Sequence, residues 1–151
     1  MRDVSVALHP ASDDEMRYVE RLLSRNELPT SDLRTGAAEF HIATRDGKRV
    51  AVCGLERYGE HGLVRSLAVE ESVRGEGVGT AVCAALEDDA RAAGVETLWL
   101  LTTTAAEFFA DRGYRECPRS DAPSAIRQTT EFDSLCPDSA VCMRLSLSDR
   151  R

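Results

Sequence analysis

The feature that most constrains the fold is a glycine-rich turn, ESVRGEGVGT at residues 71–80, which separates two different apolar patterns. The segment before it, Leu63–Glu70, alternates as a strand does, whereas Val78–Ala93 carries apolar residues at helical spacing. Three alternate glycines let the backbone approach a ligand closely, and the helix start leaves several N–H groups without an intrahelical acceptor. Together with the helix dipole, these groups predict a site for an anion such as a pyrophosphate.

Two common phosphate-binding motifs do not fit this turn. A dinucleotide fingerprint requires a third glycine where Thr80 stands, and a Walker loop requires a lysine directly after its last glycine, where Thr80 follows Gly79. A tight strand–helix turn that binds no ligand stays an open alternative.

The residues before the turn predict an antiparallel meander. Strands are expected at Val4–Leu8, Glu39–Thr44, Val50–Arg57 and Leu63–Glu70, and the Asp-Gly pair within residues 45–48 favours a hairpin turn. A helix is expected to start near Ser12, because Ser12 and Glu15 form a capping-box pattern. Its buried face is expected to carry Met16, Val19, Leu22 and Leu23, and a loop is expected over Asn26–Thr35.

The residues after the turn predict a strand–helix–strand–helix–strand order. The helix Val78–Ala93 is expected to end at a Gly94 cap, and Thr97–Thr102 has the composition of a strand buried on both faces. Further elements are expected at Ala105–Arg112, with Gly113 as its cap, at Tyr114–Cys117 and at Val141–Leu147. The connection Pro118–Asp138, with a helix around Ser124–Phe132, is long enough to suggest a functional role.

Composition narrows the class of protein. The 151 residues fit one domain, and a net charge of −7 argues against a nucleic-acid partner. No apolar run is long enough to span a membrane, and the first residues do not resemble a secretion signal. Five cysteines without a Cys-x-x-Cys pair predict reduced thiols in the cytoplasm and no structural zinc or other metal site.

Arg74–Gly79 matches the pattern Arg/Gln-x-x-Gly-x-Gly/Ala and follows a strand that ends in Leu67-Ala68-Val69. This resembles the acetyl-CoA-binding motif of the GNAT superfamily of N-acetyltransferases, and the element order from Val4 to Leu147 resembles that fold. The resemblance implies a single α/β domain over residues 1–151. Its mixed sheet would have about seven strands, flanked by about four helices, with a splay between the fourth and fifth strands.

Three segments are similar to a narrower group, the N-acetyltransferases associated with arsenic-resistance operons. They are Arg65–Val69, Leu101–Ala105 and Glu131–Pro137. The operon association describes neighbouring genes more firmly than it describes a substrate.

The superfamily resemblance implies acetyl-CoA as acetyl donor and direct attack by the amine, without an acyl-enzyme. The backbone of the fourth strand would bind the pantetheine arm, and the amides of the turn would hold the pyrophosphate. Thr102 stands where many relatives carry a cofactor-contacting asparagine, and Phe109 stands where the family usually has a tyrosine. The expected cofactor-binding residues are Leu67, Ala68, Val69, Arg74, Gly75, Glu76, Gly77, Val78, Gly79, Thr80, Thr102 and Phe109.

Catalysis requires a base more than an acid. An alkyl ammonium with a pKa around 10.4 is rarely deprotonated at pH 7, which costs about 4–5 kcal/mol. Glu56, at the end of the third strand, is the predicted base, and a solvated or Arg57-paired glutamate is the alternative. Phe109 cannot donate a proton, so Tyr114 is the candidate acid, with a buried core tyrosine as the alternative.

Arg65 is the candidate ligand for a substrate carboxylate, and a surface arginine paired with an acid is the alternative. Cys136 and Cys142 flank the entry to the last strand and would bind trivalent arsenic only if a third thiolate converged on them. Cys83 is expected to be a small buried hydrophobe.

The leading function is therefore an N-acetyltransferase for a small primary amine, amino-acid-like or arsenic-related, with the connection Pro118–Asp138 forming part of the acceptor pocket. A non-catalytic CoA-binding or arsenic-sensing module is the rival, because a tyrosine is missing at Phe109. A protein N-acetyltransferase is the third alternative. Whether the chain assembles as a homodimer stays open.

Overall fold

The computed structural model describes residues 5–26, 28, 30, 38–129, 132 and 140–147. Its strands and α-helices are β1 (Ala7–Pro10), α1 (Met16–Arg25), β2 (Glu39–Arg45), β3 (Lys48–Tyr58), β4 (His61–Val69), α2 (Val78–Ala92), β5 (Thr97–Thr102), α3 (Ala106–Asp111), β6 (Arg115–Glu116), α4 (Ser124–Arg127) and β7 (Val141–Ser146). The strands pair in the order β1-β2-β3-β4-β5-β7-β6. The predicted mixed sheet of about seven strands with about four helices is confirmed.

The chain divides into two compact units, which are described separately below. The first unit comprises residues 1–55 and 66–89, and the second comprises residues 56–65 and 90–151. Among the residues that the structure describes, no helix combines the length and the apolar content needed to cross a membrane.

The first unit contains the predicted meander. β1 pairs antiparallel with β2, and β2 pairs antiparallel with β3. Asp46 and Gly47 connect the latter pair with φ angles of 55° and 79°, which is the geometry of a two-residue hairpin turn with both central residues left-handed. β1 starts later than predicted and runs to Pro10, because pairing with residues 41–44 of β2 sets its extent. A proline is tolerated there because β1 is an edge strand.

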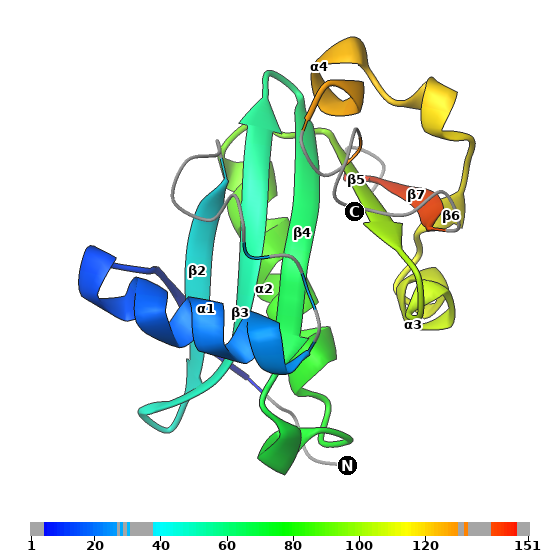
Figure 1. The fold of residues 1–151 in the computed structure, drawn as a ribbon. Helices are drawn as coiled ribbons and strands as arrows, with labels where there is room; N and C mark the ends of the chain where they lie inside the picture. Colours follow the sequence, from blue (N-terminus) through cyan, green and yellow to red (C-terminus); the bar gives the residue numbers. More distant parts are fainter. Residues whose placement is uncertain are drawn as a thin grey trace. The chain divides into compact units, whose positions relative to one another are not determined.

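Helix α1 buries the face that its periodicity predicts. Met16, Val19, Leu22 and Leu23 are all buried, and they share a cluster with side chains of β2, β3 and β4. Figure 1 shows α1 crossing one face of these strands and α2 lying behind the opposite face. The predicted bounds of α2 hold to within one residue, and its Gly94 cap has the expected positive φ, 91°.

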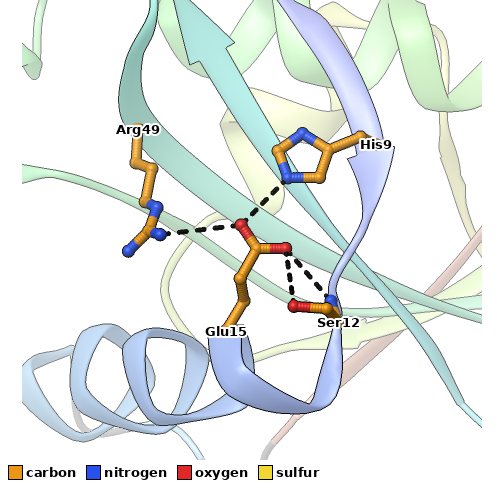
Figure 2. A network of polar contacts seen from close by, with 4 residues as sticks. All are labelled: His9, Ser12, Glu15 and Arg49. Carbon is orange, nitrogen blue, oxygen red and sulfur yellow. Dashed lines mark hydrogen bonds and ion pairs between the residues drawn. The ribbon is translucent and has the colours of Figure 1, made fainter.

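The start of the first helical segment is the predicted capping box. Residues 13–15 form a 3-10 turn that leads into α1. The Glu15 carboxylate accepts hydrogen bonds from the N–H and the hydroxyl of Ser12, at 3.1 and 3.2 Å. Its other oxygen contacts His9 at 3.2 Å and Arg49 at 3.6 Å (Figure 2). The box therefore also ties the helix start to β1 and β3.

We expect Glu15→Gln to lower Tm by a few degrees at neutral pH. Hydrogen bonds from the Ser12 N–H and from His9 lower the pKa of the Glu15 carboxyl. A carboxyl with a lowered folded-state pKa stabilises the protein above its ordinary pKa, and this contribution is lost as pH falls through the lowered value. The Tm difference between wild type and variant should therefore be smaller at a pH well below 4.5, the ordinary pKa of the group, than at neutral pH. Asp14→Asn, in the same turn but outside the network of Figure 2, is the control. An equal difference at both pH values would contradict this expectation.

The second unit is built around β5. Its first three residues pair in parallel with residues 61–63 of β4, and its whole length pairs antiparallel with β7. The pairing of β4 with β5 is thus short, as the expected splay between them requires. Leu98, Trp99 and Leu100 are buried in succession, which confirms a strand covered on both faces.

The connection after β6 differs from its prediction. β6 covers only Arg115–Glu116, and a 3-10 turn at Arg119–Asp121 precedes α4. α4 ends at Arg127, earlier than expected, where the Thr129 hydroxyl donates to the Ile126 carbonyl at 2.6 Å. A side chain that bonds the local backbone in this way competes with helix continuation. Within the rest of the predicted helix, Gln128 and Thr129 lie beyond the end of α4, Phe132 is buried, and residues 130–131 lie outside the described residues.

Candidate active site

The glycine-rich turn has the backbone geometry that the sequence predicts. β4 ends at Val69, a 3-10 turn spans Glu71–Val73, and α2 begins at Val78. Gly75 and Gly77 have φ angles of 82° and 86°, a region that L side chains rarely adopt. A Cβ at Gly75 would meet no atom within 4 Å, so the glycine is required by backbone conformation and not by packing.

The turn leaves a row of backbone donors available. Within the described residues, no backbone hydrogen bond of standard geometry outside the helices and strands starts at an N–H group of residues 75–80. Ala81 is the first residue beyond the turn whose N–H is satisfied, by the Gly77 carbonyl at 3.1 Å. Uncommitted amides at the positive end of a helix dipole form an anion site.

The charged side chains of the turn are held by neighbours in the first unit. The Glu76 carboxylate accepts a hydrogen bond from Arg45 at 2.8 Å, which offsets a negative charge next to the predicted anion site. Arg74 donates to the side-chain oxygen of Asn26, at the end of α1. Both contacts are solvent-exposed, so the turn is accessible to a ligand.

Ser66 carries a backbone feature that the sequence does not reveal. Its φ is 60°, although it lies inside β4 and is not a glycine. A residue in this conformation interrupts the regular pleat, and it directly precedes the predicted pantetheine-binding residues 67–69. Of these, Ala68 is buried against the α1 cluster, which fixes the strand. Serine has no particular preference for this region, so no sequence signal could have identified it.

We expect Ser66→Val to destabilise the protein by about 1–3 kcal/mol relative to Ser66→Gly. Both substitutions remove the hydroxyl, so the difference between them reflects the backbone conformation together with the packing of the valine methyl groups at this buried position. A β-branched residue is strongly disfavoured at a φ of 60°, whereas glycine adopts it freely. Urea unfolding of the two variants measures the difference, and equal midpoints with equal slopes would refute the assigned strain.

Glu56 lies in a buried polar cluster of the second unit. The side chain of Arg65 donates to one Glu56 oxygen at 3.3 Å, and the Tyr58 hydroxyl donates to the other. Glu56 is 4% exposed and Arg65 3% exposed. The alternative of a solvated or Arg57-paired glutamate is therefore wrong. Arg65 is paired with an acid, as its alternative predicted, but it is buried and does not lie on the surface of the sheet. A buried carboxylate needs a partner of this kind, because an unpaired charge would be costly there.

Tyr58 is the member of this cluster that sequence reasoning missed. The predicted strand ends at Arg57, yet β3 continues through Tyr58, and alternation places this residue on the same face as Glu56. Its ring packs against the apolar cluster of β4, β5 and the connection, which fixes the position of the hydroxyl. Burial, and then the hydrogen bond to Glu56, raise the pKa of Tyr58, so the phenol stays protonated and donates.

The other predicted residues of the second unit lie around α3. The Thr102 hydroxyl accepts a hydrogen bond from the Ala105 N–H at 3.0 Å and so shapes the turn into this helix. Phe109 and Tyr114 are both buried, and their rings pack edge to face with centroids 5.4 Å apart. Tyr114 thus has the surroundings of a core tyrosine, and its role as an acid stays a prediction.

The structure thus groups the predicted residues in two sets. The first unit holds the turn 74–80 and the strand residues 67–69, and the second holds Glu56, Arg65, Thr102, Phe109 and Tyr114.

The described residues contain no group of three or more side chains suited to hold a metal ion. Cys136, proposed with Cys142 as a partial arsenic site, lies outside the described residues.

Comparison with known proteins agrees with this geometry. Residues 6–117 match the model of the acetyltransferase (GNAT) family. An amino-acid acetyltransferase of Neisseria meningitidis serogroup B is 30% identical over 98 residues, which are 64% of this chain and 22% of the relative. The amino-acid acetyltransferase of Pseudomonas syringae pv. tomato is 34% identical over 96 residues, 62% of this chain and 22% of the relative. The matched region is thus about a fifth of the length of these curated relatives.

Solved structures show the same fold. N-acetylglutamate synthase from Neisseria gonorrhoeae, complexed with coenzyme A and N-acetyl-glutamate, has a TM-score of 0.82 and 22% identity. The similarity covers 99% of this chain and 36% of that chain. The ribosomal-protein-S18-alanine N-acetyltransferase from Escherichia coli has a TM-score of 0.72 and 19% identity, with 97% and 96% covered. Since the family model spans most of the sequence and the glycine-rich turn has the geometry described, this chain belongs to the acetyltransferase (GNAT) family.

Proposed function

We propose that this chain is an acetyl-CoA-dependent N-acetyltransferase that acetylates the primary amine of a small, amino-acid-like molecule. The observation that carries the proposal is the turn of residues 74–80, whose amides are uncommitted at the start of α2. Family membership supports the reaction type, and relatives named as amino-acid acetyltransferases support the acceptor class.

The residues of the first unit fit the expected cofactor. The amides of residues 75–80 would bind the pyrophosphate, and the backbone of Leu67, Ala68 and Val69 would bind the pantetheine arm. Arg74 and Glu76 flank this site, with the Glu76 charge offset by Arg45. Thr102 and Phe109 are proposed cofactor contacts on the strength of the family resemblance alone. When bound, acetyl-CoA supplies an acetyl thioester that an amine can attack.

Glu56 is the proposed general base. It would take the proton from the ammonium of the acceptor, either directly or through one water. A carboxylate has lone pairs beyond the two used by Tyr58 and Arg65, so it can accept a further hydrogen bond. Burial of Arg65 against Glu56 supports a positioning role for this arginine, and a direct role in binding a substrate carboxylate is the less favoured proposal.

The departing thiolate of coenzyme A is stable, so its protonation matters less for the rate than deprotonation of the amine does. Tyr114 stays the proposed proton donor, although its packing against Phe109 supports a core role equally well. A Tyr114→Phe variant with an unchanged kcat would remove Tyr114 from the mechanism.

An acceptor screen tests the proposed function. Release of free thiol from acetyl-CoA would be followed with L-glutamate, other amino acids, arsenic-containing amino acids, polyamines and a peptide with an N-terminal alanine. We expect the highest kcat/KM with an amino acid, and the arsenic-containing ones are included because of the three segments noted above. Coenzyme A binding without turnover of any amine would favour the non-catalytic module. Preference for the peptide would favour a protein N-acetyltransferase.

Two expectations about the cellular state are also proposals. A cytoplasmic location is proposed from the sequence, because five cysteines without a Cys-x-x-Cys pair favour reduced thiols. Assembly as a homodimer is proposed from the family resemblance, and sedimentation of the purified protein measures it.

A further inference from the structure

Two cysteines that are far apart in the sequence face each other at the edge of the sheet. β6 and β7 pair antiparallel, with Arg115 opposite Arg144 and Glu116 opposite Met143. Continued by one residue, this register places Cys117 directly opposite Cys142. The Cys117 N–H donates to the Cys142 carbonyl at 2.9 Å, and the two sulfur atoms are 3.6 Å apart.

This geometry is close to that of a disulfide. Directly opposed residues of an antiparallel pair have Cα atoms about 4.5–5.5 Å apart, and disulfides accept separations of about 4.4–6.8 Å. The sulfur atoms need only rotate from their present distance to about 2.05 Å. A bond between Cys117 and Cys142 therefore needs little movement of the backbone.

The two thiols have different surroundings. Cys117 is partly exposed and packs against the apolar cluster that contains Cys142, so it is the more accessible of the two residues. Cys142 is 3% exposed and packs in the cluster that contains Leu63 and Trp99. Burial, and then the hydrogen bond with Cys117, raise the pKa of the Cys142 thiol to about 12. Cys142 is thus protected from reagents but remains in contact with Cys117.

We propose that Cys117 and Cys142 form a redox-modification site, in which a hydroperoxide oxidises Cys117 and Cys142 closes an intramolecular disulfide. In the first step Cys117 gives its proton to solvent and the thiolate attacks the terminal peroxide oxygen. The O–O bond breaks, a sulfenic acid forms, and the departing hydroxide or alkoxide takes a proton from solvent to become water or an alcohol. In the second step the Cys142 sulfur attacks the Cys117 sulfur, the S–O bond breaks, and the hydroxyl group leaves as water with the proton of the Cys142 thiol. The two thiols lose two electrons in total, which the peroxide takes up.

The disulfide would fasten one end of the connection to β7. Cys117 is the last residue before this connection, and Ala122 and Ile126 within it pack in the same cluster as Cys142. Closing the loop between Cys117 and Cys142 lowers the entropy of the unfolded chain, so the oxidised protein should resist unfolding better. This inference does not depend on the proposed acetyltransferase activity.

The test treats the fully reduced protein with hydrogen peroxide, blocks the remaining thiols and maps the tryptic peptides without reduction. We expect a cross-link that joins residues 116–119 to residues 128–144, two hydrogen atoms lighter than the separate peptides and reversed by dithiothreitol. Peptide 128–144 also contains Cys136. The experiment is therefore repeated in Cys136→Ser, where the same cross-link should persist.

Thermal unfolding gives a second readout. We expect oxidation to raise Tm by roughly 5–10 °C in wild type and in Cys136→Ser, with reversal by dithiothreitol. Cys117→Ser should show neither the cross-link nor the rise, and Cys83→Ser, in the first unit, should show both. Cys117 is partly exposed, so its variant keeps the test valid even if Cys142→Ser does not fold.

Three results would overturn the proposal. The first is a cross-link that requires Cys136, the second is a disulfide between two molecules on a non-reducing gel, and the third is oxidation of Cys117 to sulfinic acid without any cross-link.

Discussion

Glu56→Gln should lower kcat for acetyl transfer by about 10²–10⁴-fold at pH 7, because the amide cannot accept the proton of the ammonium. Glutamine keeps the shape of the side chain and can still accept hydrogen bonds from Tyr58 and Arg65. Steady-state release of free thiol, with the best amine of the acceptor screen at saturating acetyl-CoA, measures the loss. The defect should shrink as the pH approaches the pKa of the amine, since the acceptor then arrives already deprotonated.

The controls separate this loss from damage to the fold. The Kd for coenzyme A should be unchanged in Glu56→Gln, since the predicted anion site lies in the turn of residues 74–80. Tyr58→Phe removes one hydrogen bond to the carboxylate and leaves the proposed base in place, so its kcat should fall far less. A wild-type rate in Glu56→Gln at every pH would exclude Glu56 as the base, and the deprotonated amine would then come from solution.

Gly75→Ala should weaken coenzyme A binding about tenfold or more. A left-handed conformation costs a non-glycine residue about 1–2 kcal/mol, and escape to a negative φ would turn the adjacent amides away from the ligand. No atom lies within 4 Å of the added Cβ, so the effect is not steric. Isothermal titration with coenzyme A measures Kd, and Gly77→Ala, at a φ of 86°, should behave alike.

Gly94→Ala is the matched control for this prediction. Gly94 has a φ of 91° and an equally open Cβ position, but it caps the far end of α2. Both substitutions should cost about 1 kcal/mol of folding free energy, and only Gly75→Ala should change the Kd. Equal affinities in the two variants would mean that the amides of the turn do not bind the coenzyme.

Much of the fold could be predicted because its signals are local. The buried face of α1, the Asp46-Gly47 turn, the Gly94 cap and the extent of β5 each depend on residues close together in the sequence. Short-range sterics and hydrogen bonds decide such features, and side-chain types encode them directly. The bounds of β1, β6 and α4 were predicted less well, since strand pairing and a side-chain bond from Thr129 limit them.

The glycine-rich turn could be predicted from local sequence, and the family resemblance implies the class of ligand for it. The surroundings of the chemical groups could not be predicted in this way: Arg65 against Glu56, the left-handed Ser66, and Cys117 opposite Cys142. Each of these depends on the register between strands and on burial by distant segments. A contact between two strands depends on many weak long-range interactions, so no single residue type predicts it.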